Sequence, residues 1–239
     1  MGRLFLFRHA QASFLSQNYD QLSALGQTQA RLLGEYWARR KILFARVCSG
    51  PALRQLHTAQ IAREAYREAG LAFSEPIVMQ EFDEFQGDAV LFQSLPQLLA
   101  QDQKIRDLHG ALQASGNEVE KRAAFHRLFE AVVSLWVKGA IAPKNVEPWQ
   151  DFCSRVHRGL AGFLANSGQG ANVAVFTSGG PIAVAVRRAL HLSSEDTLQL
   201  VWMSRNCSCS EFLFSRDRFT LSSFNTYPHL ENDALLTYR

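Results

Sequence analysis

A short apolar run near the N-terminus constrains the fold more than any other feature of the sequence. Residues 3–7, Arg-Leu-Phe-Leu-Phe, are almost wholly apolar and are followed directly by Arg8 and His9. Such a run is typical of a strand buried on both faces, as in a parallel sheet. Polar residues that follow it lie at the carboxyl edge of the sheet, where open α/β sheets bind ligands. Arg8 offers a fork of donors that suits phosphate, and a neutral His9 offers a nucleophilic nitrogen.

Two later segments also begin with a predicted strand, which leads through a turn into a helix. A strand predicted at 44–48 leads through a turn into a helix whose first turn carries Arg54. A strand predicted at 172–176 leads into Ser178, Gly179 and a further helix. Free N–H groups at a glycine-rich helix start bind anions, although an ordinary tight connection has the same sequence.

The alternation of strands and helices predicts an α/β fold. We expect a three-layer sandwich, in which a mostly parallel open sheet carries helices on both faces. Residues 207–214 and 219–224 alternate as a hairpin. Residues 87–147 break the rhythm with helical patterns and no clear strand. They predict a helical insertion in a single domain, 1–239, which either covers or flanks the site or packs without a role in access.

Composition excludes several classes of protein. The net charge is +3 in 239 residues, and no cluster of Lys and Arg indicates a nucleic-acid partner. No apolar run approaches the roughly 20 residues of a membrane helix, and no signal peptide precedes the first strand, so a cytoplasmic protein without a membrane partner is expected. The four cysteines match no zinc pattern and predict free buried thiols: Cys48, Cys153, Cys207 and Cys209. The oligomeric state stays open.

The polar residues at the strand ends favour phosphoryl transfer. The strand ends supply Arg8 with His9, Ser49 with Arg54, and Ser178 with Gly179, while Glu81 follows a strand predicted at 76–79. Arginines can hold the phosphoryl oxygens, and an imidazole nitrogen can accept the phosphoryl group covalently. A carboxylic acid can protonate the leaving oxygen and then activate water. This chemistry needs neither a metal nor a cofactor.

Several motifs resemble the histidine phosphatase superfamily, also called the phosphoglycerate mutase-like family. Arg8-His9-Ala10-Gln11-Ala12 resembles its signature Arg-His-Gly-Glu/Gln-Ala/Thr, and residues 48–59 resemble Ser-Ser-x-x-x-Arg-x-x-x-Thr-Ala. Residues 22–30, Glu81 to Asp83, 173–183 and 225–230 extend the resemblance to roughly half of the chain. The order and spacing of these motifs make the signal specific.

The resemblance assigns a role to each site residue. It implies that His9 is the phosphorylated nucleophile and that Glu81 is the proton donor. The phosphate ligands that it implies or that the strand edges supply are Arg8, Gln11, Ser49, Arg54, Ser178 and Gly179. The expected ligand is a small phosphorylated substrate or inorganic phosphate.

Two positions depart from the family pattern. Ala10 replaces a glycine and adds a methyl group, for which we expect a mild effect. Ser178 stands where the family has its second active-site histidine, which donates a hydrogen bond to the phosphoryl group. Losing one such donor can cost about a hundredfold in rate, of which a hydroxyl should recover part. His57 and His229 are candidates to replace the missing imidazole.

Several functions fit these observations. The first hypothesis is a metal-independent phosphomonoester hydrolase, whose activity Ser178 could reduce. A catalytically impaired phospho-ligand-binding or regulatory protein is the alternative that Ser178 motivates. A mutase is less favoured, because no Glu-Arg-x-Tyr-Gly segment follows the predicted acid. A serine hydrolase using Ser178 would need glycine where Phe176 stands in the nucleophile elbow.

Overall fold

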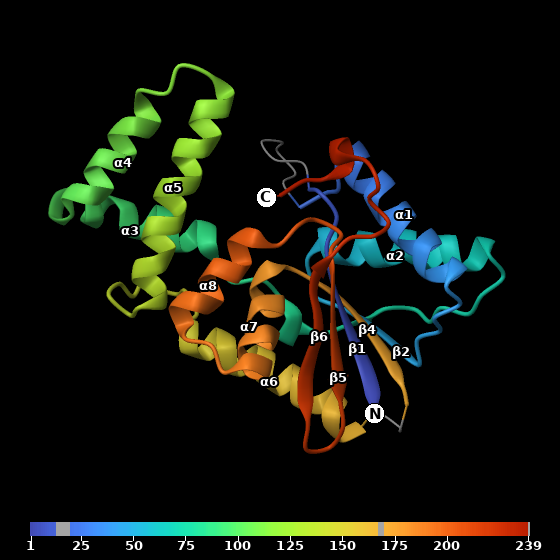
Figure 1. Ribbon diagram of the computed structural model, residues 1–239. Coiled ribbons are helices and arrows are strands. Elements are labelled where there is room, and N and C mark those ends of the chain that lie inside the picture. Colours follow the sequence, from blue (N-terminus) through green and yellow to red (C-terminus); the bar gives the residue numbers. More distant parts are fainter. Residues whose placement is uncertain (13–19, 167–169, 239) are drawn as a thin grey trace. The chain divides into compact units, whose positions relative to one another are not determined.

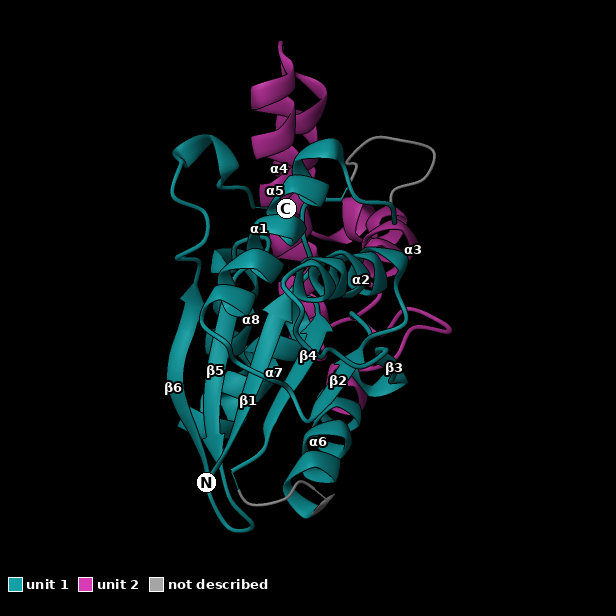
Figure 2. Ribbon diagram, turned by 90° about the vertical axis from the view of Figure 1, so that its right-hand side faces the viewer, with its two compact units in different colours: residues 1–84, 153–239 teal, residues 85–152 magenta. Residues whose placement is uncertain are grey.

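The computed structural model of the protein describes residues 1–12, 20–166 and 170–238. The chain divides into two compact units. Unit 1 comprises residues 1–84 and 153–239 and contains the sheet, and unit 2 comprises residues 85–152 and is helical (Figure 2).

Unit 1 is built on a six-stranded sheet in the order β3-β2-β4-β1-β5-β6 (Figure 1). Its strands are β1 (Gly2–Arg8), β2 (Arg46–Ser49), β3 (Ile77–Val78), β4 (Asn172–Thr177), β5 (Cys209–Phe214) and β6 (Phe219–Thr226). The first four run parallel, while β5 pairs antiparallel with both β1 and β6. The predictions of a mostly parallel sheet and of a hairpin near the C-terminus are therefore confirmed.

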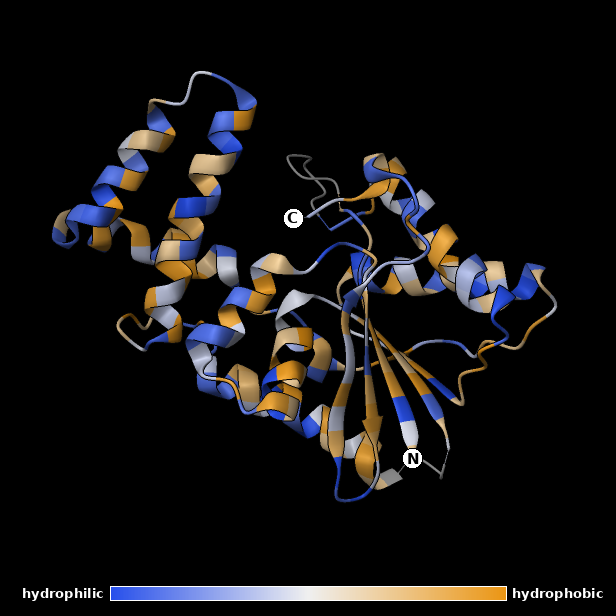
Figure 3. Cartoon of the chain, in the orientation of Figure 1, coloured by the Kyte–Doolittle hydropathy of each residue, from blue (hydrophilic) through white to orange (hydrophobic). Residues whose placement is uncertain are grey.

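The apolar N-terminal run lies near the centre of the sheet as β1, between β4 and β5. Successive side chains of a strand point to opposite faces, and here both faces are buried. Phe5 and Phe7 pack edge-on against Trp37, at centroid distances of 5.1 and 5.8 Å. Leu4 and Leu6 are fully buried as well. Hydrophobic residues run along these strands in Figure 3. The double burial explains why this run is continuous rather than alternating.

Helices cover both faces of the sheet in unit 1 (Figure 1). One face carries α1 (Ala24–Arg39) and α2 (Leu53–Glu68), and the other carries α6 (Trp149–Asn166), α7 (Gly179–Leu190) and α8 (Ser194–Met203). The Ser23 hydroxyl caps α1 by accepting from the Gly26 N–H at 3.0 Å. A Cβ at Gly34 would lie 2.7 Å from the backbone of Ala62, so glycine allows α1 and α2 to pack closely.

Unit 2 contains α3 (Gly87–Gln101), α4 (Gln103–Gln113) and α5 (Glu118–Val137). Its range encloses the insertion expected at 87–147. The Asn117 side chain caps α5 by accepting from the Glu120 N–H at 2.9 Å. The apolar face of α5 includes four buried residues, namely Leu128, Phe129, Val132 and Trp136. The expected role of this unit in covering the site stays a prediction.

Two further expectations from composition can be compared with the structure. All four cysteines are free and buried, as predicted. Burial raises the pKa of the Cys48, Cys207 and Cys209 thiols, which keeps them protonated. None of the helices in the described parts of the chain is long and apolar enough to cross a membrane.

Candidate active site at the carboxyl edge of the sheet

Three parallel strands end side by side at one edge of the sheet. Arg8, the last residue of β1, is in register with Thr177 of β4. Ser49, the last residue of β2, is in register with the residue that precedes Thr177. The N–H groups of His9 and Gly50 continue the pairing with β4 carbonyl groups at 2.8 and 2.9 Å. The residues that follow each strand are thereby held at one edge, as the sequence predicts.

His9 is held in one tautomer by two hydrogen bonds. Its Nδ1–H donates to its neighbour's carbonyl oxygen, that of Ala10, at 2.8 Å. The Arg54 Nε–H donates to His9 Nε2 at 3.3 Å, so Nε2 is the nitrogen with the lone pair. His9 is only 7% exposed. The ring therefore directs an unprotonated nitrogen toward a guanidinium group, the arrangement that a nucleophile for a bound anion requires.

Arg54 is positioned by Asp20, a residue that the sequence reasoning missed. Its Nη1 lies 2.6 Å from Asp20 Oδ1, and Asp20 Oδ2 accepts from the N–H of Leu53 at 2.8 Å. The N-cap residue of α2 is Ala52, which has no side-chain acceptor, so Asp20 serves the free N–H groups of this helix end. No sequence signal indicates this role, since Asp20 precedes the helix by more than 30 residues.

Arg8 lies beside the start of α7. Its guanidinium donates to the carbonyl oxygen of Ser204, at the end of α8. Its Nε lies 3.9 Å from the position that a Cβ on Gly179 would occupy. The structure therefore brings Arg8 and Gly179 together, as predicted from their places at neighbouring strand ends.

Ser178 immediately precedes α7 and pairs with Gln55, which the sequence reasoning also missed. Gln55 Nε2 donates to Ser178 Oγ at 2.7 Å, and both residues are fully buried. An amide is not a base, so this partner cannot take the Ser178 proton as a serine hydrolase requires. Gln55 immediately follows Arg54, but nothing in the sequence indicates that it reaches β4.

Glu84 brings a carboxylate to the start of α7. Its Oε2 accepts from the N–H of Gly180 at 3.1 Å. Glu81, predicted as the acid, is half-buried, and its Cβ lies 2.7 Å from where a Cβ on Gly159 of α6 would stand. Phe82, between the two acids, stacks on Phe163 of α6 and fixes this segment. The sequence contains both carboxylates, but it does not indicate that Phe82 packs on α6 and that Glu84 is the one that contacts the start of α7.

Two other predicted phosphate ligands, Gln11 and Ser49, make hydrogen bonds within the protein. Gln11 Oε1 accepts from the hydroxyl of Ser23 at 2.8 Å, and the Ser49 hydroxyl donates to the Gly50 carbonyl at 2.8 Å. The contact of Gln11 and Ser49 with phosphate stays a prediction. The methyl group of Ala10 belongs to the apolar cluster that contains Phe5 and Phe7. The mild effect expected of alanine there stays a prediction.

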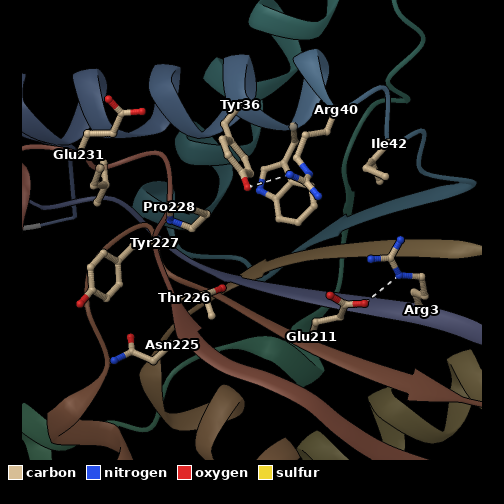
Figure 4. A pocket seen from close by; sticks show the side chains of 12 residues that line it. Arg3, Tyr36, Arg40, Ile42, Glu211, Asn225, Thr226, Tyr227, Pro228 and Glu231 are labelled. Carbon is tan, nitrogen blue, oxygen red and sulfur yellow. Dashed lines mark hydrogen bonds and ion pairs between the residues drawn. The ribbon is translucent and has the colours of Figure 1, made fainter.

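A cavity of about 820 Å³ lies in another part of unit 1, between α1, β6 and residues 227–231. Arg40 donates to the hydroxyl of Tyr36 on its wall, and Arg3 pairs with Glu211 (Figure 4). Its described lining contains none of the residues predicted for the phosphate site.

His229, one of the two candidates for the missing imidazole, packs against Tyr36 at a centroid distance of 6.0 Å. His57 is half-buried on α2. The hydrogen-bond partner of Ser178 in the described chain is Gln55 rather than either histidine. Burial lowers the pKa of His229 to about 4.

This pKa predicts a loss of stability in acid. Above pH ~6.5 the His229 ring is neutral in both the folded and unfolded states. Between pH ~6.5 and about 4 the unfolded chain binds a proton that the folded protein does not, so the free energy of unfolding falls by about 3 kcal/mol. Urea unfolding of wild type and His229→Gln at pH 7.5 and pH 4 measures the difference. Equal losses in the two proteins would contradict this assignment.

The carboxyl edge of this largely parallel sheet carries an unprotonated imidazole nitrogen, two guanidinium groups and a carboxylate. These are the elements of an α/β phosphoryl-transfer protein. The chain belongs to the histidine phosphatase superfamily (branch 1), whose family model matches residues 4–138 and 114–227. Membership supports a phosphohydrolase or mutase type of enzyme. The comparison with curated proteins found no match to the chain.

Solved structures share the fold along almost the whole chain. A mycobacterial glucosyl-3-phosphoglycerate phosphatase in complex with inorganic phosphate has a TM-score of 0.60 at 21% identity, covering 96% of this chain and 99% of its own. The alpha-ribazole phosphatase of Shigella flexneri has a TM-score of 0.60 at 20% identity, with coverages of 94% and 96%. A phosphoglycerate mutase of Bacillus anthracis has a TM-score of 0.60 at 16% identity, with coverages of 96% and 95%. At these identities the likeness concerns the fold alone.

Proposed function

We propose that the protein is a phosphomonoester hydrolase that acts through a phosphohistidine on His9. The observation that carries this proposal is the tautomer of His9, whose Nδ1 is bound to the Ala10 carbonyl while Nε2 faces Arg54. A phosphate between His9 and Arg54 would replace their mutual contact with one to each residue. Inorganic phosphate in the structure of the mycobacterial phosphatase supports a small phosphorylated ligand for this fold.

Hydrolysis takes two steps. His9 Nε2 attacks phosphorus, the bond to the ester oxygen breaks, and a carboxylic acid gives its proton to the leaving alkoxide. The same carboxylate then takes a proton from water as the water oxygen attacks the phosphohistidine, which releases phosphate and restores His9. Arg8 and Arg54 offset the negative charge of the phosphoryl oxygens in both steps, and the Gly179 N–H offers a further donor at the start of α7.

Glu84 is the carboxylate that we assign to proton transfer. Its contact with the Gly180 N–H supports this role, because it places the acid at the helix start where the phosphoryl group would bind. The Cβ of Glu81 packs against Gly159 of α6, which favours a structural rather than a catalytic role for Glu81.

A leaving-group comparison tests the function and the acid together. Wild type should hydrolyse both an alkyl phosphate and p-nitrophenyl phosphate, with rates unchanged by a metal chelator. Glu84→Gln should lower kcat about 100-fold for the alkyl phosphate. It should lower kcat much less for p-nitrophenyl phosphate, because nitrophenolate leaves without protonation.

Glu81→Gln is the matched control, a neighbouring carboxylate changed in the same way. It should stay within about threefold of wild type on both substrates. The opposite pattern would assign the acid to Glu81. Tight binding of phosphate without turnover of any phosphomonoester would show instead that the protein binds phospho-ligands without hydrolysing them. That is the alternative function that Ser178 motivates.

A further inference from the structure

The side-chain amide of Gln55 links two of the three strand edges at the site. Its Oε1 accepts from the N–H of Ala52 at 3.1 Å, and its Nε2 donates to Ser178 Oγ at 2.7 Å and to the carbonyl oxygen of Phe82 at 3.3 Å. A backbone N–H must face the amide oxygen and a carbonyl must face the amide nitrogen. These two backbone groups therefore fix which end of the amide meets Ser178.

The orientation of Gln55 determines what the Ser178 hydroxyl can do. A hydroxyl group has one hydrogen to donate and two lone pairs that accept. Because Gln55 donates to Ser178 Oγ, it occupies an acceptor position and leaves the hydroxyl hydrogen for another acceptor. Among the described residues the Ser178 hydroxyl accepts from Gln55 and donates to no other group. Its hydrogen is thus left for an acceptor that binds at the helix start, next to the N–H of Gly179.

We propose that Gln55 is a positioning residue that turns the Ser178 hydroxyl into a hydrogen-bond donor for the phosphoryl group. Together the two residues provide the donor that an imidazole at position 178 would otherwise supply. The inference rests on the proposed function, since it concerns the same phosphate site. It assigns a role to a residue at an unspecified (x) position of the motif in residues 48–59.

The packing around Gln55 couples this side chain closely to Ser178. Gln55 and Ser178 are both fully buried. A Cβ on Gly50 would lie 2.1 Å from Gln55 Oε1, so the glycine leaves the space that the amide fills. An imidazole at position 178 would extend toward the amide 2.7 Å away. Ser178→His alone should therefore displace Gln55 rather than add a donor to an intact site.

A double-mutant cycle on orthovanadate binding tests the inference. Vanadate resembles the phosphoryl group, and calorimetry measures its binding without any need for turnover. Gln55→Met keeps the length of the side chain but removes its hydrogen bonds, and Ser178→Ala removes the hydroxyl. Each should weaken vanadate binding by about tenfold, and the double variant should bind no more weakly than either single variant. Thermal unfolding checks that each variant is folded.

Gln55→Glu provides a second variant with a distinct signature. A carboxylate at position 55 accepts from Ser178 instead of donating to it, so the hydroxyl hydrogen turns away from the phosphate. This variant should bind vanadate at least as weakly as Ser178→Ala, and Ser178→Ala should then have no further effect. Additive losses, or unchanged binding in Gln55→Met and Gln55→Glu, would overturn the inference alone. Absence of vanadate binding by wild type would overturn the proposed function with it.

Discussion

His9→Ala is expected to abolish phosphomonoester hydrolysis, with kcat reduced by at least about 10⁴-fold. The expectation follows from covalent catalysis, because loss of the nucleophile removes the reaction path and not just one contact in it. The structure adds a specific reason, since Nδ1 is engaged by the Ala10 carbonyl and only Nε2 is directed toward Arg54. Steady-state rates with p-nitrophenyl phosphate, measured at high enzyme concentration, provide the comparison.

His191→Asn is the matched control for this variant. His191 is exposed at the end of α7 and has a left-handed backbone conformation (φ 57°), which asparagine tolerates. Its kcat should equal that of wild type. A His9→Ala protein that is folded and retains more than about a tenth of the wild-type rate would exclude His9 as the nucleophile.

Arg54→Ala should have the next largest effect, a loss of about 10³-fold in kcat/KM. A guanidinium that stabilises the charge of a transferring phosphoryl group contributes on this order. The Arg54 Nε lies 3.3 Å from His9 Nε2, so the group that we propose to hold phosphate also contacts the proposed nucleophile. Arg54→Lys should recover only part of the loss, because lysine lacks the fork that contacts both Asp20 and the phosphate. Rates and phosphate inhibition constants measure both effects.

Arg63→Ala is the control within the same helix. Arg63 is exposed on α2 and pairs with Glu75 at the surface. Exposed pairs contribute little, so kcat/KM should change by less than about twofold. Arg54→Ala with normal phosphate inhibition would show that the anion binds elsewhere.

The sequence predicts most of the fold because its central strands, β1 and β4, are buried on both faces. The apolar runs at residues 3–7 and 172–176 can only lie inside a sheet, and they are paired in the structure as β1 and β4. The edge strand predicted at 76–79 is present but shorter, because a strand at the edge of a sheet buries little. β3 consists of two exposed residues, Ile77 and Val78, and is defined by its pairing with β2.

The candidate site likewise contains residues whose positions the sequence predicts and residues whose positions it does not. Arg8 ends β1, and His9 and Ser178 directly follow β1 and β4, so their places at the edge follow from the sequence. Gln55 reaches Ser178 across 123 positions, and Glu84 reaches Gly180 across 96. Such contacts depend on how helices and loops pack on the sheet, and no local pattern indicates them.

The most direct test of the account is to trap the phosphoenzyme. Wild type is mixed with a ³²P-labelled phosphomonoester, quenched in alkali during turnover and digested for mass spectrometry. We expect an acid-labile, alkali-stable phosphoryl group on the peptide that contains His9, present in wild type and absent from His9→Ala. Label on another residue, or rapid turnover with no label on the protein in any quench, would contradict a phosphohistidine at His9.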